Sequence, residues 1–335
     1  MEANTQEKKI QYSKLSFEEL KDLAKKGDAK AQNSLGVCYA KGDGVRKNLV
    51  KAMEWYTKAA EKGSTIAQFN LAAHYYNGDG VKQDYVKALE WYHKAAEQGN
   101  SWSQNDIAAC YYNGFGVKKD LKKAVEWWTK AAEQGYSVAQ NNLALCYLFG
   151  EGVRKNFKKA ADWLTKAAEQ GNPEAQHNLA LCYERGDGVK KNYQKAFEWF
   201  SKAAEQGVAG SQYRLARCYR KGRGVERNHA KAAECFQKAA EQGHGLAQFY
   251  LGVCFEEGAG VEKDYEKAAK WYIKAAKQGV VEAQFNIAMF YMFGTGVKKS
   301  KVKSVKWLTK AAEQGDEKAK KNLSNLKHEA SVKQR

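Results

Sequence analysis

The stretch AQFNLAAHYYNGDGVKQDYVKALEWYHKAAEQG, residues 67–99, contains every element of a pattern that recurs along the chain. Each copy opens on an Ala-Gln or Ser-Gln pair whose glutamine returns every 36 residues, at Gln32, Gln68, Gln104, Gln140, Gln176, Gln212, Gln248 and Gln284. A fixed period of this length is typical of repeats that stack side by side. The sequence therefore predicts an all-α protein, an α-solenoid of eight 36-residue helix-turn-helix repeats.

The middle of each copy raises a question of chemistry. In KGDGVRKN, residues 41–48, two glycines and a basic pair resemble a phosphate-binding loop, which needs a strand before it and a helix N-terminus after it. No β-branched run precedes any copy, and eight nucleotide sites in one chain are implausible. A helix-to-helix turn explains the pattern better: Gly42 is predicted to end one helix at positive φ, and Asn48 to cap the next. Every equivalent of Asn48 is Asn, Asp or Ser.

The two ends of the chain depart from the repeat. Residues 1–27 are predicted to form a tail and a capping helix, residues 28–315 the eight repeats, and residues 316–335 a C-terminal capping helix and polar tail. Ser16 and Glu19 have the spacing of a capping box. Capping helices at both ends are what a solenoid requires to cover its terminal repeats.

Composition bounds the class of protein. The 335 residues are 44% hydrophobic, and the net charge of +18 favours acidic partners. No run of 18 or more apolar residues occurs, and the N-terminal segment lacks the apolar core of a signal peptide. We therefore expect no membrane span and a cytoplasmic location, with export into a host by a route without a signal peptide left open. The odd number of cysteines, seven, does not suit a secreted disulfide framework.

No pattern of side chains indicates catalysis, a cofactor or a metal site. Six of the seven cysteines occupy one position of the first helix, and stacked repeats hold equivalent residues further apart than the roughly 7 Å that a disulfide spans. Free, buried thiols are expected there. The six histidines lack metal-ligand spacing, and no activated nucleophile is recognisable. The chain is predicted to be non-enzymatic.

Two columns of the second helix are assigned structural roles. Trp55 and its equivalents are predicted to be repeat core. Glu54 and Lys58, with the equivalent residues of five further repeats, have the i,i+4 spacing of ion pairs on a solvated face.

The quoted stretch resembles the Sel-one-like repeat family, which is related to the tetratricopeptide repeats. The resemblance covers Gly27 to Gly315 in eight in-phase copies. It implies a right-handed superhelix with the first helix of each repeat on the concave side. It also implies the family's usual role as an adaptor that assembles protein complexes.

The first helix varies between copies at the first, fifth, eighth and ninth residues after the glutamine, which share one face that we call the variable face. In the resemblance this face is concave. Its aromatic, methionine and arginine side chains have the composition of interaction hot spots. The sequence predicts a groove that binds a protein or peptide segment with hydrophobic anchors and an acidic centre, although inter-repeat packing would bury part of the set. The candidate residues, including the adjacent Arg214, are Phe69, Tyr76, Tyr112, Leu148, Phe149, His177, Tyr213, Arg214, Arg217, Arg220, Lys221, Phe249, Phe285, Met289 and Met292.

The alternative partner is nucleic acid or another polyanion, bound along a basic edge that follows the turn valines. Cations near helix N-termini oppose the helix dipole, and a polyanion would offset that cost. Solubility combined with repeat duplication explains the same pattern and is preferred. Self-assembly is a third possibility that the polar ends disfavour, so a monomer is expected. The candidate edge residues are Arg46, Lys47, Lys82, Lys118, Lys119, Arg154, Lys155, Lys190 and Lys191, alongside a lysine column from Lys51 to Lys303.

Overall fold

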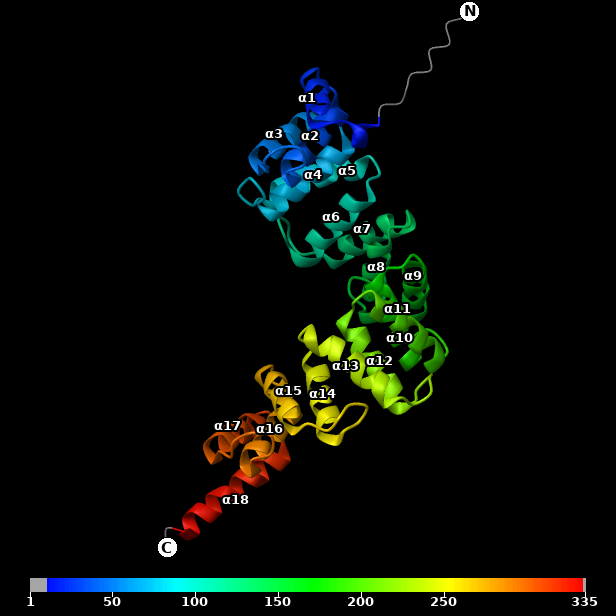
Figure 1. Ribbon diagram of the computed structural model, residues 1–335. Helices are drawn as coiled ribbons and strands as arrows, with labels where there is room; N and C mark the ends of the chain where they lie inside the picture. The colour runs from blue at the N-terminus through cyan, green and yellow to red at the C-terminus, as the bar shows by residue number, and fades with distance from the viewer. Residues whose placement is uncertain (1–10, 334–335) are drawn as a thin grey trace, which may run out of the picture. The chain divides into compact units, whose positions relative to one another are not determined.

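The computed structural model describes residues 11–333, with side chains described as far as Leu326. The rest of the predicted N-terminal tail (residues 1–10) and residues 334–335 lie outside this part of the chain. The described residues form helices without any strand (Figure 1). The helices are η1 (Tyr12–Lys14), α1 (Phe17–Lys25), α2 (Ala29–Lys41), α3 (Leu49–Glu61), α4 (Thr65–Asn77), α5 (Tyr85–Glu97), α6 (Ser101–Asn113), α7 (Leu121–Glu133), α8 (Ser137–Phe149), α9 (Phe157–Glu169), α10 (Pro173–Arg185), α11 (Tyr193–Glu205), α12 (Ala209–Lys221), α13 (His229–Glu241), α14 (Gly245–Glu257), α15 (Tyr265–Lys277), α16 (Val281–Phe293), α17 (Lys301–Glu313) and α18 (Glu317–Lys333).

Each repeat consists of two 13-residue helices, an even-numbered helix A (α2 to α16) and an odd-numbered helix B (α3 to α17). Within each unit, helix A packs against helix B of its own repeat, as α2 does on α3, and helix B packs against the next helix A, as α3 does on α4. The predicted α-solenoid is confirmed. The chain divides into two compact units, which we call the first unit (to Ala167) and the second unit (from Ala168); the division falls within α9.

The core of each unit combines small residues at helix contacts with one large side chain from each helix B. Alanines such as Ala52, Ala59 and Ala67 are fully buried and let neighbouring helices approach closely. The large side chains are Tyr56, Tyr92, Trp128 and Leu164 in the first unit, and Phe200, Phe236, Tyr272 and Leu308 in the second.

The two glycines of each turn have different tasks. Gly42 ends α2 at φ 90°, a left-handed conformation that favours glycine, and the Asn48 side chain accepts from the Lys51 N–H at 3.0 Å to begin α3. Both predictions are confirmed. The second glycine is explained by packing between repeats: a Cβ on Gly224 would lie 2.0 Å from the carbonyl oxygen of Tyr193, which begins helix B of the preceding repeat. The Gly-x-Gly motif is therefore architectural.

The repeat glutamine holds consecutive repeats together. Gln68 donates from Nε2 to the carbonyl of Ala60, one of the carbonyls that the end of α3 leaves without a helical partner, at 3.2 Å. Its Oε1 accepts from Gln98 at 2.8 Å. The first repeat lacks this second bond because Lys62 replaces the glutamine equivalent to Gln98, and the buried Gln32 Oε1 is left without a hydrogen-bond donor.

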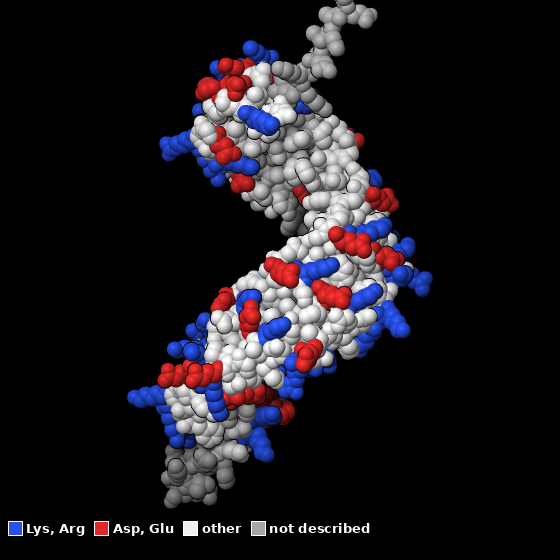
Figure 2. Space-filling view, turned by 45° about the vertical axis from the view of Figure 1, so that its right-hand side comes forward, with Lys and Arg blue, Asp and Glu red and all other residues white. Residues whose placement is uncertain are grey.

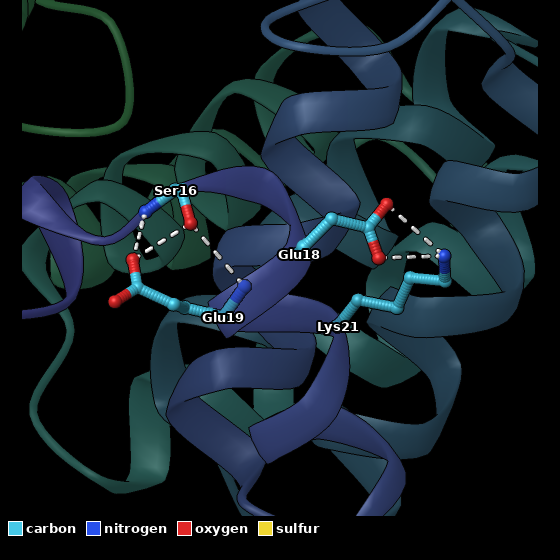
Figure 3. A network of polar contacts seen from close by, with 4 residues as sticks. All are labelled: Ser16, Glu18, Glu19 and Lys21. Atoms are coloured by element: carbon cyan, nitrogen blue, oxygen red, sulfur yellow. Dashed lines mark hydrogen bonds and ion pairs between the residues drawn. The ribbon is translucent and has the colours of Figure 1, made fainter.

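The first helix begins with the predicted capping box (Figure 3). The Glu19 carboxylate accepts from the Ser16 N–H at 2.8 Å, and Ser16 Oγ accepts from the Glu19 N–H at 3.4 Å. One turn away, Lys21 Nζ lies 2.9 Å from the Glu18 carboxylate. The two Ser16–Glu19 contacts satisfy backbone donors that the start of α1 leaves free.

Helix B differs from the prediction in two respects. Trp55 and its equivalents are half-buried, and the fully buried column is the following residue. Lys58 Nζ lies 4.3 Å from the Trp55 ring centroid, and among the described residues Lys58, Lys94, Lys130 and Lys202 stack on indoles rather than pairing with the glutamates four residues before them. The prediction of ion pairs was wrong for these four. It holds in repeat six, where Cys235 replaces the tryptophan and Lys238 lies 2.7 Å from Glu234.

Candidate partner-binding face

In the first unit the variable face is an aromatic surface. Phe69 is half-buried, with its ring centroid 5.6 Å from that of Trp102. Tyr76 lies edge-on to Tyr85, and Tyr112 donates its hydroxyl to Glu151 of the next turn at 2.7 Å. Leu148 is half-buried, while Phe149 is 68% exposed. Of these candidates Phe149 is therefore the most available to a partner.

One row of this surface escaped the sequence analysis. Ile66, Trp102 and Val138 lie two residues before the repeat glutamine in three consecutive repeats, and are 54%, 46% and 38% exposed. The equivalent residues in the neighbouring repeats are Lys30 and Glu174. The signal that could have found the row is this change from charged to apolar at an unburied position of the repeat.

In the second unit, Tyr213 and Arg214 belong partly to the fold. Tyr213 is 6% exposed, and its ring is stacked on that of His244 with centroids 4.7 Å apart. Arg214 forms an ion pair with Glu184 at 3.0 Å, and both side chains are largely shielded from solvent. Arg214 is therefore already committed to a partner within the chain.

Four further cations lie around the C-terminal turn of α12, and we call them the arginine cluster: Arg217, Arg220, Lys221 and Arg223. The guanidinium carbons of the three arginines lie over tyrosine rings, 5.7 Å from Tyr213, 4.3 Å from Tyr250 and 5.5 Å from Tyr193 respectively. Among the described side chains no carboxylate oxygen lies within 4.0 Å of these three guanidinium groups. Arg223 belongs to the turn after α12, so the helical spacing that defines the variable face does not include it.

The electrostatics of the cluster show mutual repulsion. The positive charges of Arg223 and Arg217 are the largest causes that lower the pKa of the exposed Lys221 ammonium. Arg220 lowers it further, while Glu184 is the weakest of the named influences and acts in the opposite direction. The cluster is thus a local excess of positive charge that the fold does not neutralise.

His177 is half-buried beside this surface. Its Nδ1 is 2.7 Å from Ser211 Oγ, and burial together with the charge of Arg214 lowers its pKa to about 4. Burial also lowers the pKa of His244, whose Nδ1 accepts from the Ala247 N–H at the start of α14. Both rings are therefore neutral near pH 7, so His177 presents no charge to a partner.

The last candidates of the variable face pack near the C-terminal helix. Phe285, Met289 and Met292 are half-buried in a cluster that includes Leu308 of α17 and Ala319 of α18. Phe249 is half-buried, with its ring near Tyr250 and Tyr272. The inter-repeat packing that the sequence analysis weighed thus accounts for a large part of these four side chains.

All nine candidates of the basic edge are exposed. Several have structural neighbours: Lys119, Lys155 and Lys191 lie over aromatic rings. The adjoining column from Lys51 to Lys303 does the same in every repeat, with each ammonium 5.1–5.6 Å from the ring that helix A presents. In Figure 2 basic and acidic side chains are interspersed on the visible face of the second unit.

The cysteines and the possible metal ligands were also compared with the sequence predictions. All seven cysteines are free, as predicted, and burial raises the pKa of the Cys110 and Cys146 thiols to about 12. No group of three or more His, Cys, Asp or Glu residues within the described chain could hold a metal ion. The helices described include none with a long enough apolar stretch to cross a bilayer.

Stacked two-helix repeats with a variable face on helix A define the class of helical-repeat proteins. The Sel1 repeat model matches eight consecutive segments, residues 29–64, 65–100, 103–136, 137–172, 173–208, 209–244, 245–280 and 281–316. The chain belongs to the Sel1 repeat family. Proteins of this family generally mediate protein–protein interactions as non-catalytic repeat scaffolds.

Two solved structures show the similarity in three dimensions. One is the crystal structure of c5321, described as a protective antigen of uropathogenic Escherichia coli strains with an SLR fold. Its sequence is 40% identical, the match covers 93% of this chain and 67% of the c5321 chain, and the TM-score is 0.85. A Sel1 repeat protein from Oxalobacter formigenes is 37% identical, covers 92% of this chain and 90% of its own, and has a TM-score of 0.70. No curated protein matches the chain.

Proposed function

We propose that this protein is an adaptor that binds a polypeptide segment on the variable face of its second unit, with the arginine cluster holding acidic groups of that segment. The observation that carries the proposal is the set of three guanidinium groups that lie on tyrosine rings without a carboxylate partner. Membership of a family that generally mediates protein–protein interactions supports the class of partner.

The chemistry of binding follows from the arginine side chain. A guanidinium group presents a planar fork of donors that matches a carboxylate in two parallel hydrogen bonds. A ring beneath it restricts its orientation, so less conformational entropy is lost when an anion binds. The half-buried Phe249 supplies apolar surface in the next repeat.

The test is affinity capture from the source lysate after nuclease treatment. The intact chain is compared with an Arg217→Glu/Arg220→Glu variant and with a control of equal charge change, Lys270→Glu/Lys277→Glu, on exposed positions of α15. Arg214 is left unchanged because its reversal would break the ion pair with Glu184. A defined protein that is retained by the intact chain and the control, and lost by the arginine variant, supports the proposal. Equal retention by all three forms contradicts it.

A polyanion on the basic edge is the second candidate function. Its supporting observation is a pocket of about 550 Å³ in the first unit, lined by Arg154, Lys155 and Lys159 beside Tyr147. Binding there would depend steeply on salt, since each phosphate contact releases counterions. Retention of nuclease-sensitive material alone, lost when Arg154 and Lys155 are replaced by glutamine, would favour this function.

We place the adaptor in the cytoplasm as a monomer. Seven free cysteines, five of them buried, suit a reducing compartment, where thiols remain unoxidised. Sedimentation of the purified chain tests the monomer.

A further inference from the structure

We propose that the arginine cluster is a phosphoryl-binding site, which takes a phosphorylated Ser, Thr or Tyr side chain of the bound polypeptide. This inference rests on the proposed adaptor function and specifies its ligand. It is carried by the excess of cations at one place, by the position of three of them over tyrosine rings, and by the replacement of acidic residues that other repeats have at the equivalent positions.

The comparison between repeats shows that the positive charge is specific to repeat six. The residue between the two turn glycines is acidic in four copies, Asp43, Asp79, Glu151 and Asp187, whereas repeat six has Arg223. In the first unit, the turn residue Glu151 accepts from Tyr112, the equivalent of Arg220. For Arg220, the equivalent turn residue of the next repeat is Ala259. Arg220 therefore lacks the carboxylate acceptor that Glu151 gives Tyr112. Both changes favour an external anion.

Two nearby carboxylates are engaged elsewhere. Glu184 pairs with Arg214 at 3.0 Å, and Glu256 accepts a hydrogen bond from the Tyr272 hydroxyl. The cluster therefore has three arginines and one lysine without an internal counter-ion within 4.0 Å. The C-terminal end of a helix carries partial negative charge, which lets α12 tolerate cations that repel one another.

The number and type of donors fit a phosphoryl group better than a carboxylate. A carboxylate carries one negative charge and two oxygens, which one guanidinium group saturates. A phosphorylated side chain carries about −1.5 to −2 charges near pH 7 and three acceptor oxygens, so it can engage several guanidinium groups at once. Three arginines that lie over tyrosine rings without a carboxylate partner supply N–H donors for such an acceptor.

The experiment measures retention of the full chain on three immobilised peptide libraries. Each library has four random positions on either side of a fixed central residue, which is phosphoserine, serine or glutamate. We expect the phosphoserine library to retain the chain at least about tenfold more tightly than the glutamate library, since the dianion engages more donors. Circular dichroism melting of each variant establishes that it is folded.

Three variants locate the binding. Arg217→Gln/Arg220→Gln should lose the preference for phosphoserine, and Lys270→Gln/Lys277→Gln, which removes the same charge from α15, should keep it. Arg217→Lys/Arg220→Lys keeps the charge but removes the planar fork, and should lose most of the preference.

Three results would overturn the inference. Equal retention on phosphoserine and glutamate libraries, with the same dependence on Arg217 and Arg220, leaves the adaptor standing and removes the phosphoryl specificity. Retention that survives Arg217→Gln/Arg220→Gln, and that an oligothymidylate competitor abolishes, assigns phosphate binding to the basic edge instead. No retention on any library also rejects the inference, whereas the adaptor itself is decided separately by the lysate capture.

Discussion

Lys62 stands where each of the other seven repeats has glutamine. The equivalent Gln206 donates to the carbonyl of Gly171 at 3.0 Å and to Gln176 Oε1 at 2.8 Å. Lys62 makes only the first of these two bonds, to the Gly27 carbonyl, and its ammonium leaves the buried Gln32 Oε1 without a donor. A buried acceptor without a donor costs about 1–3 kcal/mol.

We therefore expect Lys62→Gln to raise the free energy of unfolding by about 1 kcal/mol, because glutamine can make both bonds. Urea unfolding followed by circular dichroism measures the change. Lys25→Gln, which removes the same charge from an exposed site of the first unit, is the control and should have almost no effect. A variant no more stable than this control would show that the missing bond is not what the first repeat lacks.

Asp106 is a second residue that destabilises the fold, because its ionisable carboxyl group is largely shielded from solvent. Burial raises the pKa of its carboxyl group, while hydrogen bonds from Asn105 and Tyr92 lower it. Four other repeats have asparagine there: Asn70, Asn142, Asn178 and Asn286. Since the folded state binds the proton more tightly than the unfolded state, stability falls as pH rises above 3.8, the unfolded value, and stays lower near pH 7.

Asp106→Asn removes this cost and should stabilise the chain by about 1 kcal/mol at pH 7, with a smaller gain at pH 4. Chemical denaturation of both forms at the two pH values measures the difference. An equal gain at pH 4 and pH 7 would mean that the effect does not come from ionisation of the carboxyl group.

At the level of elements, two glycines separate backbone strain from packing. Gly207, in the turn after α11, and Gly224, the second glycine of a Gly-x-Gly turn, both have positive φ, 90° and 72°. A Cβ on Gly207 would meet nothing within 4 Å, whereas a Cβ on Gly224 would lie against the backbone at Tyr193. Gly207→Ala should cost about 1–2 kcal/mol from the left-handed conformation alone. Gly224→Ala should cost about 1–3 kcal/mol more, because consecutive repeats must move apart. Thermal melting of the two variants compares them, and equal losses would contradict a packing role for the second glycine.

Sequence was sufficient for the elements themselves, because helix ends are governed by local chemistry. The glycine that ends helix A and the Asn or Asp that caps helix B act within a few residues, and the structure confirms both. Helix-surface pairing was less predictable, since an i,i+4 glutamate and an i,i+3 tryptophan lie within reach of the same lysine. Lys58 stacks on Trp55, and only the loss of the ring at Cys235 leaves Lys238 to pair with Glu234.

For the whole molecule, the variable face was only partly predictable. Helical spacing places Arg217 and Arg220 together, and the structure agrees. Helical spacing cannot place Arg223, because a turn residue follows no helical period. Arg223 contacts the ring of Tyr193, which begins helix B of the preceding repeat. Nor does the spacing show that α18 packs near Met289 and Met292. Which positions stay open depends on how consecutive repeats pack, and that is a property of the assembled unit.

The stability of the whole chain should fall in acid, with His177 as one identifiable cause. Its pKa is lowered from 6.5 to about 4 by burial and by Arg214. The unfolded chain takes up the proton near pH 6.5 while the folded chain resists it, so the contribution is fully present above pH 6.5 and is lost as pH falls to about 4. The loss amounts to about 2–3 kcal/mol.

His177→Asn should remove this part of the acid sensitivity, because asparagine occupies the same position in three other repeats, as Asn33, Asn105 and Asn141, and does not titrate. Urea unfolding of both forms at pH 7.5 and pH 4.5 isolates the effect as a difference of differences, since all other titrating groups are shared. We expect the variant to lose less stability between the two pH values than the native chain, by up to about 2–3 kcal/mol. If both forms lose the same amount of stability, protonation of His177 does not limit the acid stability of the second unit. His244 is then the next residue to test, because burial also lowers its pKa. Its Nδ1 caps α14 only when that nitrogen is unprotonated.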